Sequence, residues 1–218
     1  SRYQELLPEY LTVTDTIIPP GVGIDGSSYR DQAGDMTVYG LNSDSAKSHY
    51  QAMLNATGVQ QVTGLSVLIA ENDSVNNEQY FGYLSQVIQR ELNLFLTVET
   101  VDQSEFDSRL ASGNYDLAIV SLEADFDHPV SILEDFQTGS AENNTGYSDS
   151  TLDSYLDQLY RGSDGEAGLC KLAEQHLLDS GIFLPLYYQT SYLAVDKSVS
   201  GVFLNPQNGA VDFRYARF

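Results

Sequence analysis

The sequence has no tryptophan, a single cysteine and few basic residues. Ten lysines and arginines stand against 31 aspartates and glutamates in 218 residues, so the formal charge at pH 7 is −21. Nucleic acids and anionic membrane surfaces attract proteins through lysine and arginine, so this shortage argues against both as partners. The one cysteine, Cys170, excludes an internal disulfide, and its helical surroundings predict a small buried residue.

Signatures of membrane insertion and of catalysis are also missing. No apolar run is long enough to span a bilayer, and no secretory signal peptide is recognisable. There is no phosphate-binding glycine loop, no nucleophile elbow and no CxxC or HExxH pattern. The three histidines lack metal-ligand spacing, and Asp125–Asp127 lacks the glycine and glutamate of a calcium loop. We therefore expect no catalytic site, no metal and no cofactor.

What the chain does have is an alternation of apolar runs and helical patterns in its middle. Leu65–Ala70 and Tyr115–Leu122 are short apolar runs of the kind that form strands, the second one buried on both faces, and Leu94–Thr100 predicts a strand by its alternation of apolar and polar residues. Amphipathic helices are predicted between them at 75–93 and 102–112. The order strand, helix, strand, helix, strand predicts a largely parallel sheet with right-handed crossovers.

The flanking regions carry shorter signals. Residues 2–11 predict a short helix, and residues 12–40, rich in glycine and proline, predict an irregular segment. Ser150 and Asp153 predict the cap of a helix. Further elements are predicted as helices at 44–57, 129–138, 150–159 and 166–179, and as strands at 182–188, 192–195, 202–204 and 210–213.

The segment Gly113–Pro129 carries the main functional signal. Its apolar run ends in three carboxylates, Glu123, Asp125 and Asp127. Ligands of open α/β sheets bind just beyond the carboxyl ends of such strands. The residues alone favour a plainer role, in which Asp125 or Asp127 caps the helix that begins at Pro129.

The same segment resembles a motif of the extracytoplasmic oligopeptide- and dipeptide-binding proteins of ABC importers. Gly113, Tyr115–Leu117, Asp125–Phe126 and Pro129 fall at the matching positions, whereas Leu122 stands where the motif has tryptophan. Weaker matches extend the resemblance over about residues 15–218. They are Ile18–Gly21, Ala46–Gly58, Asn144, Tyr147, Asp153, Leu172–Glu174, Leu177, Asp179, Leu186–Tyr188 and Val199–Gly201.

The resemblance implies an α/β fold of the periplasmic-binding-protein type II-like lobe, with a mixed, mostly parallel sheet flanked by helices. It implies that residues 1–218 form the single C-terminal lobe of a two-lobed protein. Within that lobe, residues 1–40 would be an irregular N-terminal segment wrapping the lobe, and residues 41–218 the α/β core.

The implied function is that of the substrate-binding component of an ABC importer, which captures oligopeptides or dipeptides outside the membrane by lobe closure. Its partners would be a peptide or other small solute, the missing N-terminal lobe and the importer's membrane subunits, and the protein would be a monomer. The implied location is extracytoplasmic, either periplasmic or as a cell-surface lipoprotein anchored through a missing N-terminus.

In the resembled family, the aspartate at the position of Asp125 pairs with the α-ammonium group of a bound peptide. The resemblance thus implies a ligand-binding site at Asp125, Leu122, Glu123, Phe126 and Tyr147. Leucine at position 122 leaves more room than tryptophan, so the pocket is wider or the ligand is not a short peptide. Two alternatives follow: a family member that binds an oligosaccharide, metal chelate or other small solute, or an acidic protein-interaction module.

Overall fold

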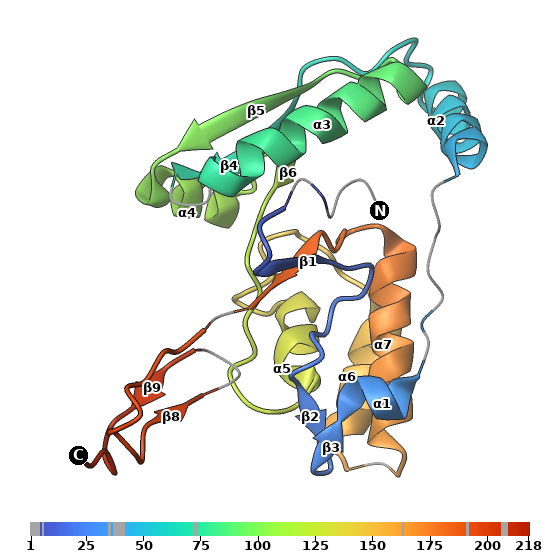
Figure 1. Ribbon diagram of the computed structural model, residues 1–218. Coiled ribbons are helices and arrows are strands. Elements are labelled where there is room, and N and C mark those ends of the chain that lie inside the picture. The colour runs from blue at the N-terminus through green and yellow to red at the C-terminus, as the bar shows by residue number, and fades with distance from the viewer. Residues whose placement is uncertain are drawn as a thin grey trace. The chain divides into compact units, whose positions relative to one another are not determined.

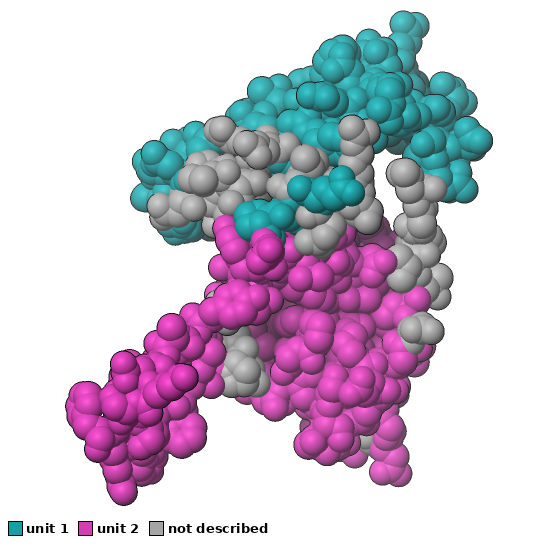
Figure 2. All heavy atoms as spheres, viewed as in Figure 1, with its two compact units in different colours: residues 1–8, 39–121 teal, residues 9–38, 122–218 magenta. Residues whose placement is uncertain are grey.

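The computed structural model divides the chain into two compact units (Figure 2). Unit 1 comprises residues 1–8 and 39–121, and unit 2 comprises residues 9–38 and 122–218. The prediction of a single lobe over residues 1–218 is not tested by this division and stays a prediction. The structure describes residues 5, 7–34, 36, 42–71, 74–162, 164–190, 192–205 and 209–218, for residues 74–79 in their backbone only.

A three-stranded parallel sheet forms the centre of unit 1 (Figure 1). β4 (Leu65–Ala70) lies between β5 (Leu96–Val101) and β6 (Leu117–Ala118), and every residue of β4 pairs with one of β5. Leu68 in the central strand is fully buried. The predicted order of strands and helices and their parallel pairing are confirmed.

β6 is shorter and more exposed than its apolar sequence predicted. Only Leu117 and Ala118 pair with β4, and the Leu117 residue is 48% exposed. The carboxylate of Asp116 accepts hydrogen bonds from the backbone N–H and the hydroxyl of Ser66, at 2.9 and 3.2 Å. β6 is an edge strand of the described sheet, and its residues are exposed or only partly buried, so the prediction of a strand buried on both faces is wrong.

Three helices accompany this sheet, close to the predicted bounds. Asp102 begins the last of them, since its carboxylate accepts a hydrogen bond from the backbone N–H of Glu105 at 2.9 Å. Gly113 ends that helix in a left-handed conformation, with φ of 67°. No helix in the described part of the chain is long and apolar enough to cross a membrane. The helices are α2 (Ser43–Thr57), α3 (Ser74–Leu92) and α4 (Gln103–Ser112).

Helices also surround the core of unit 2, whose members include the fully buried Ile132, Leu152 and Leu177. The predicted helix at 129–138 is a short α-helix followed by a 3-10 turn. The predicted cap of the next helix is displaced by one residue, because Asp149 accepts the hydrogen bonds of that helix's first N–H groups. The elements are α1 (Tyr29–Ala33), α5 (Val130–Leu133), η3 (Glu134–Phe136), α6 (Ser150–Tyr160) and α7 (Glu166–Ser180).

The N-terminal part of unit 2 is more regular than predicted. β1 (Leu11–Val13) pairs antiparallel with β7 (Tyr187–Gln189), so a helix reaching residue 11 is wrong; residues 1–4 and 6 lie outside the described residues. β2 (Gly23–Ile24) and β3 (Ser27–Ser28) form a hairpin with positive φ at both turn residues. The segment enters the core through Ile18, which is fully buried.

The end of the chain forms a second hairpin. β8 (Phe203–Leu204) pairs antiparallel with β9 (Val211–Asp212), as predicted, although the turn residue Asn208 lies outside the described residues. The predicted strand at 192–195 is wrong, since these residues are exposed and do not pair in the described structure. The predicted strand at 182–188 is wrong in its first part, because β7 begins only at Tyr187. Pro185 lies before β7 and outside the strand, which suits a residue without a backbone donor.

Candidate functional site

The segment that follows unit 1 forms a loop, residues 122–129, called here the acidic loop. Leu122 packs against the core of unit 2, and Ala124 is only 2% exposed. These two residues hold the first half of the loop on the core, while four other side chains of the loop face solvent. The exposed members are Glu123, Asp125, Phe126 and Asp127, with Phe126 47% exposed.

The backbone at Asp125 is fixed by the short helix that comes after the loop. The hydroxyl oxygen of Ser131, a residue 2% exposed, accepts a hydrogen bond from the Asp125 N–H at 2.7 Å and a longer one from the Phe126 N–H at 3.4 Å. No described residue donates a hydrogen bond to the Asp125 carboxylate. The backbone of Asp125 is therefore ordered, while its carboxylate has no hydrogen-bond donor among the described residues.

Asp127 does not cap α5, contrary to prediction. Its Oδ1 accepts a hydrogen bond of 2.6 Å from the backbone N–H of Gly23 in β2. The Nδ1 atom of His128 accepts from the Val130 N–H at 3.1 Å instead, because the imidazole lies next to the first turn. Since Asp125 does not cap the helix either, the plainer role suggested for these two carboxylates is wrong.

The surroundings of the acidic loop are negatively charged. Partial burial, together with the charges of Glu142, Glu134 and Asp125, raises the pKa of Asp135 to about 6. The charges of these neighbours add to the effect of burial on this pKa, and carboxylates gathered in one place create a local potential that attracts cations. No group of three or more His, Cys, Asp or Glu side chains among the described residues is arranged to hold a metal ion.

Tyr147 comes from a different loop, between η3 and α6. Its ring packs against the same core that Leu122 contacts, and burial raises the pKa of its hydroxyl. The side-chain amide of Asn143 donates to the Tyr147 carbonyl at 2.9 Å and so fixes the backbone there. Leu122 and Tyr147 thus pack against the same core. The backbone N–H groups of Asp125 and Phe126 both donate to the hydroxyl group of Ser131. Direct contact of any of the five residues with a ligand stays a prediction.

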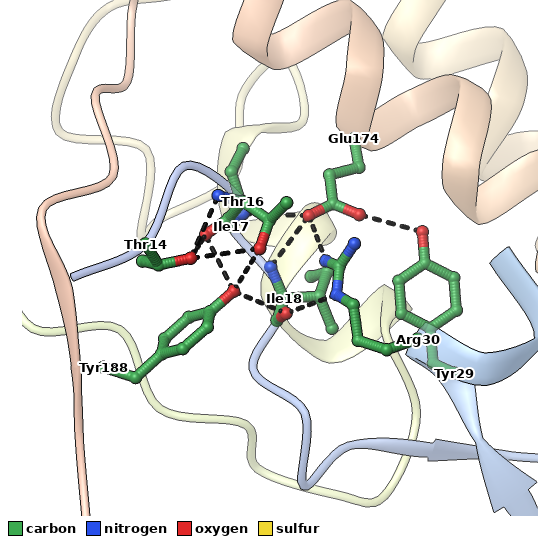
Figure 3. A network of polar contacts seen from close by, with 8 residues as sticks. All are labelled: Thr14, Thr16, Ile17, Ile18, Tyr29, Arg30, Glu174 and Tyr188. Carbon is green, nitrogen blue, oxygen red and sulfur yellow. Dashed lines mark hydrogen bonds and ion pairs between the residues drawn. The ribbon is translucent and has the colours of Figure 1, made fainter. Parts of the chain in front are cut away.

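A buried polar network supports this half of unit 2 (Figure 3). Glu174 on α7 is fully buried, and its Oε1 accepts hydrogen bonds from the backbone N–H groups of Ile17 and Ile18 at 2.8 and 2.9 Å. Its Oε2 accepts from the Tyr29 hydroxyl at 2.9 Å, and Arg30 forms an ion pair with it. One carboxylate therefore fixes the chain on both sides of the β2–β3 hairpin.

Tyr188 of β7 extends the same network. Its hydroxyl lies 2.6 Å from the Thr16 hydroxyl and 2.8 Å from the carbonyl oxygens of Thr16 and Ile18. The sequence analysis did not predict this polar network, although the position of Glu174 in its helix was a signal for it. Glu174 takes a place on the apolar face of α7 with Cys170, Ala173 and Leu177, all buried, where an unpaired carboxylate would be costly.

Known proteins similar to this chain are peptide-binding proteins, although no protein-family model matches it. The dipeptide-binding protein DppE of Bacillus subtilis is 20% identical over 221 residues, covering 98% of this chain and 40% of the relative. The oligopeptide-binding protein OppA of the same organism is 28% identical over 181 residues, covering 79% of this chain and 32% of the relative. The chain thus spans less than half the length of these curated relatives.

Solved structures show the same fold. OppA of Listeria monocytogenes bound to peptide superposes with a TM-score of 0.77 at 19% identity, covering 99% of this chain and 42% of that one. OppA of Haemophilus influenzae in complex with RPPGFSPFR gives 0.72 at 17% identity, covering 91% and 38%. The chain therefore has the mixed α/β fold of a periplasmic-binding-protein lobe, as predicted.

The solved structures show the fold of the chain, and the curated relatives show which proteins it is similar to in sequence. All three curated relatives are named as binding proteins for dipeptides or oligopeptides, none as an enzyme. The resemblance to the extracytoplasmic oligopeptide- and dipeptide-binding proteins of ABC importers, inferred from the motifs of residues 113–129, is confirmed.

Proposed function

We propose that the chain is a ligand-binding lobe of the substrate-binding component of an ABC importer, which captures oligopeptides or dipeptides outside the membrane. One observation carries the proposal: the exposed carboxylate of Asp125 has no hydrogen-bond donor among the described residues, yet its backbone is held by Ser131. A charge kept free on an ordered loop is suited to a cationic partner.

Asp125 is the residue that pairs with the α-ammonium group of the bound peptide. Closure of a second lobe over the loop would remove water from the carboxylate, and the ammonium would offset the desolvation. Such a charge-assisted hydrogen bond contributes about 1.5–3 kcal/mol. The charges of Glu142 and Glu134, which add to the effect of burial on the pKa of Asp135, support the same assignment, because they attract a cation to the loop.

The other proposed ligand residues surround this charge. Phe126 offers an exposed ring next to Asp125 in the chain, and Glu123 adds a second exposed carboxylate. Leu122 and Tyr147 would wall the pocket from the core side. Peptide side chains would be held through bridging water, since tolerance of different sequences is easier with water-mediated contacts than with dry ones.

The remaining parts of the proposal concern the whole protein. It would act extracytoplasmically, in the periplasm or as a lipoprotein anchored through a segment that precedes this chain. It would deliver its ligand to the importer's membrane subunits as a monomer, with an N-terminal lobe completing the cleft.

The test is calorimetric titration of the two-lobed protein with free-amine peptides and with N-acetylated versions of the same peptides. Asp125→Asn keeps the shape of the side chain and removes its charge, so affinity for free-amine peptides should fall about tenfold to a hundredfold. N-acetylated peptides lack the ammonium and should bind weakly to both proteins. Parent and variant should melt at similar temperatures, because the Asp125 carboxylate has no described partner to lose.

Asp157→Asn is the matched control. Asp157 on α6 is an exposed carboxylate 3.6 Å from Arg161, and its loss changes the net charge by the same amount. An acidic interaction module would respond to both substitutions alike and would weaken steeply with salt. Equal affinities of Asp125→Asn and parent for free-amine peptides would refute the role of Asp125. Tight binding of oligosaccharides or metal chelates, without peptide binding, would favour the other solute classes.

A further inference from the structure

We propose that the β2–β3 hairpin, residues 23–28, positions the acidic loop, with Gly23 and Asp127 as the positioning residues. The proposal rests on the proposed function, in which Asp125 meets a ligand ammonium, and it adds what holds Asp125 in place. The contact joins parts of the chain 104 positions apart, through the N–H of Gly23 and the carboxylate of Asp127.

The presence of glycine at position 23 has a steric explanation. Its φ lies outside the left-handed region, so the backbone conformation of β2 would accept other residues. A Cβ atom at this position would lie 2.9 Å from Oδ2 and 3.0 Å from Oδ1 of Asp127, well inside van der Waals contact. The glycine is therefore explained by the close approach of the acidic loop. A Cβ atom at Gly21, two residues earlier, would meet no other atom within 4 Å, so that glycine has no such explanation.

The hairpin is a firm support for this contact. Ile18 before it and Tyr29 after it both bind the buried Glu174 carboxylate. Ile24, the neighbour of Gly23 in β2, is 1% exposed in the core of unit 2. The donor N–H is thus carried by a segment that is anchored on both sides.

The acidic loop is in turn held at two neighbouring points. The Asp125 N–H is bound by Ser131 at 2.7 Å, and two residues later the Asp127 carboxylate is bound by Gly23 at 2.6 Å. Between these points the exposed side chains of Asp125 and Phe126 have little backbone freedom to lose when a ligand binds. Such preorganisation raises affinity by lowering the entropy lost on binding.

Four substitutions distinguish the positioning of the acidic loop by Asp127 from the effect of the charge of Asp127. Asp127→Ala removes the acceptor and the charge, whereas Asp127→Asn removes the charge and keeps an oxygen that can accept from Gly23. Gly23→Ala alters no charge and forces the Asp127 carboxylate away from the Gly23 N–H, because its Cβ would overlap that carboxylate. Gly21→Ala adds the same methyl group in the same segment without a contact and is the matched control.

The first readout needs no ligand. Hydrogen exchange of the Asp125 and Phe126 amides in the full-length protein should accelerate about threefold to tenfold in Asp127→Ala and Gly23→Ala. It should stay at the parent rate in Asp127→Asn and Gly21→Ala. Gly23→Ala added to Asp127→Ala should cause no further acceleration, because the shortened side chain leaves room for the methyl group.

The second readout is the ratio of affinities for free-amine and N-acetylated peptides. Loss of positioning should lower this ratio about threefold to tenfold in Asp127→Ala and Gly23→Ala, whereas general destabilisation would weaken both peptides equally. If Asp127→Asn behaves like Asp127→Ala, the charge alone matters and the positioning role is overturned; unchanged exchange in Gly23→Ala and Asp127→Ala also overturns it. If exchange accelerates as expected while the parent shows no preference for free amines, positioning stands and the proposed function fails.

Discussion

Replacing Glu174 by glutamine is expected to destabilise unit 2 strongly. The carboxylate is fully buried and binds two backbone N–H groups, the Tyr29 hydroxyl and Arg30. Glutamine has nearly the same shape, and its oxygen can keep both backbone hydrogen bonds. Its amide nitrogen, however, replaces an acceptor with a donor facing Tyr29, and the charge of Arg30 loses its partner.

The size of the destabilisation by Glu174→Gln follows from the interactions that the substitution removes. A hydrogen bond to a charged group contributes about 1.5–3 kcal/mol, and removing one partner of a buried ion pair costs about 3–5 kcal/mol. The Arg30 side chain retains 17% exposure, so water relieves part of its lost pairing. We expect the free energy of unfolding to fall by about 2–3 kcal/mol, which lowers the melting temperature of a chain this long by about 4–12 °C.

Urea unfolding and thermal melting at pH 7, followed by circular dichroism, measure this change. Glu105→Gln is the matched control, since Glu105 is exposed and lies 3.9 Å from Arg109; its loss should change the unfolding free energy by less than about 0.5 kcal/mol. Combining Glu174→Gln with Arg30→Met should recover part of the stability, because no uncompensated charge remains. A loss below about 1 kcal/mol in Glu174→Gln would refute the importance of the buried charge.

Two further predictions concern single groups of unit 2. Folding raises the pKa of Asp135 from 3.8 to about 6, so the native state holds this proton more tightly and the free energy of unfolding should decline as pH rises from about 4 through 6. Asp135→Asn should therefore match the parent at pH 3.5 and exceed its stability at pH 7.5 by about 1 kcal/mol, a figure reduced for solvent screening of the half-buried carboxyl; melting curves showing no gain at pH 7.5 would contradict this. Cys170 is fully buried, and burial with the nearby Glu166 and Glu174 raises the pKa of its thiol to about 12. Thiol reagents should label it on the order of a thousandfold more slowly in the native protein than in urea, as expected from the thiolate fraction, and rapid native labelling would show that the helix opens.

The sequence predicted the elements whose signals are local. α4 lies between a capping aspartate, Asp102, and a terminating glycine, Gly113, and both act as predicted. β1 was missed because its partner β7 lies far along the chain: Leu11 pairs with Gln189, and no window of neighbouring residues contains both. β6 was predicted too long because apolar composition indicates neither how many neighbours a strand has nor how much of it stays exposed.

The candidate site was predicted only in part, because only some of its features depend on residues that are neighbours in the sequence. The placement of three carboxylates after a strand is a local pattern, and the structure shows Glu123, Asp125 and Asp127 exposed on one loop. The partner of Asp127 could not be read from its neighbours, because Gly23 is 104 positions away. A glycine inside a strand often marks the close approach of another segment, but residues 12–40 were predicted to be irregular, so this signal could not be recognised at position 23.

The division of the chain has a consequence for its biosynthesis. Ile17 and Glu174 are 157 positions apart, and residues 39–121 of unit 1 are translated between them. At about 5–20 residues per second, the apolar segment around Ile17 waits on the order of ten seconds for α7 to be translated. Unit 1 can complete its sheet in that interval, whereas unit 2 cannot close. The surplus of acidic residues, which gives the chain its charge of −21, is then useful on the ribosome, because like charges keep incomplete chains from associating.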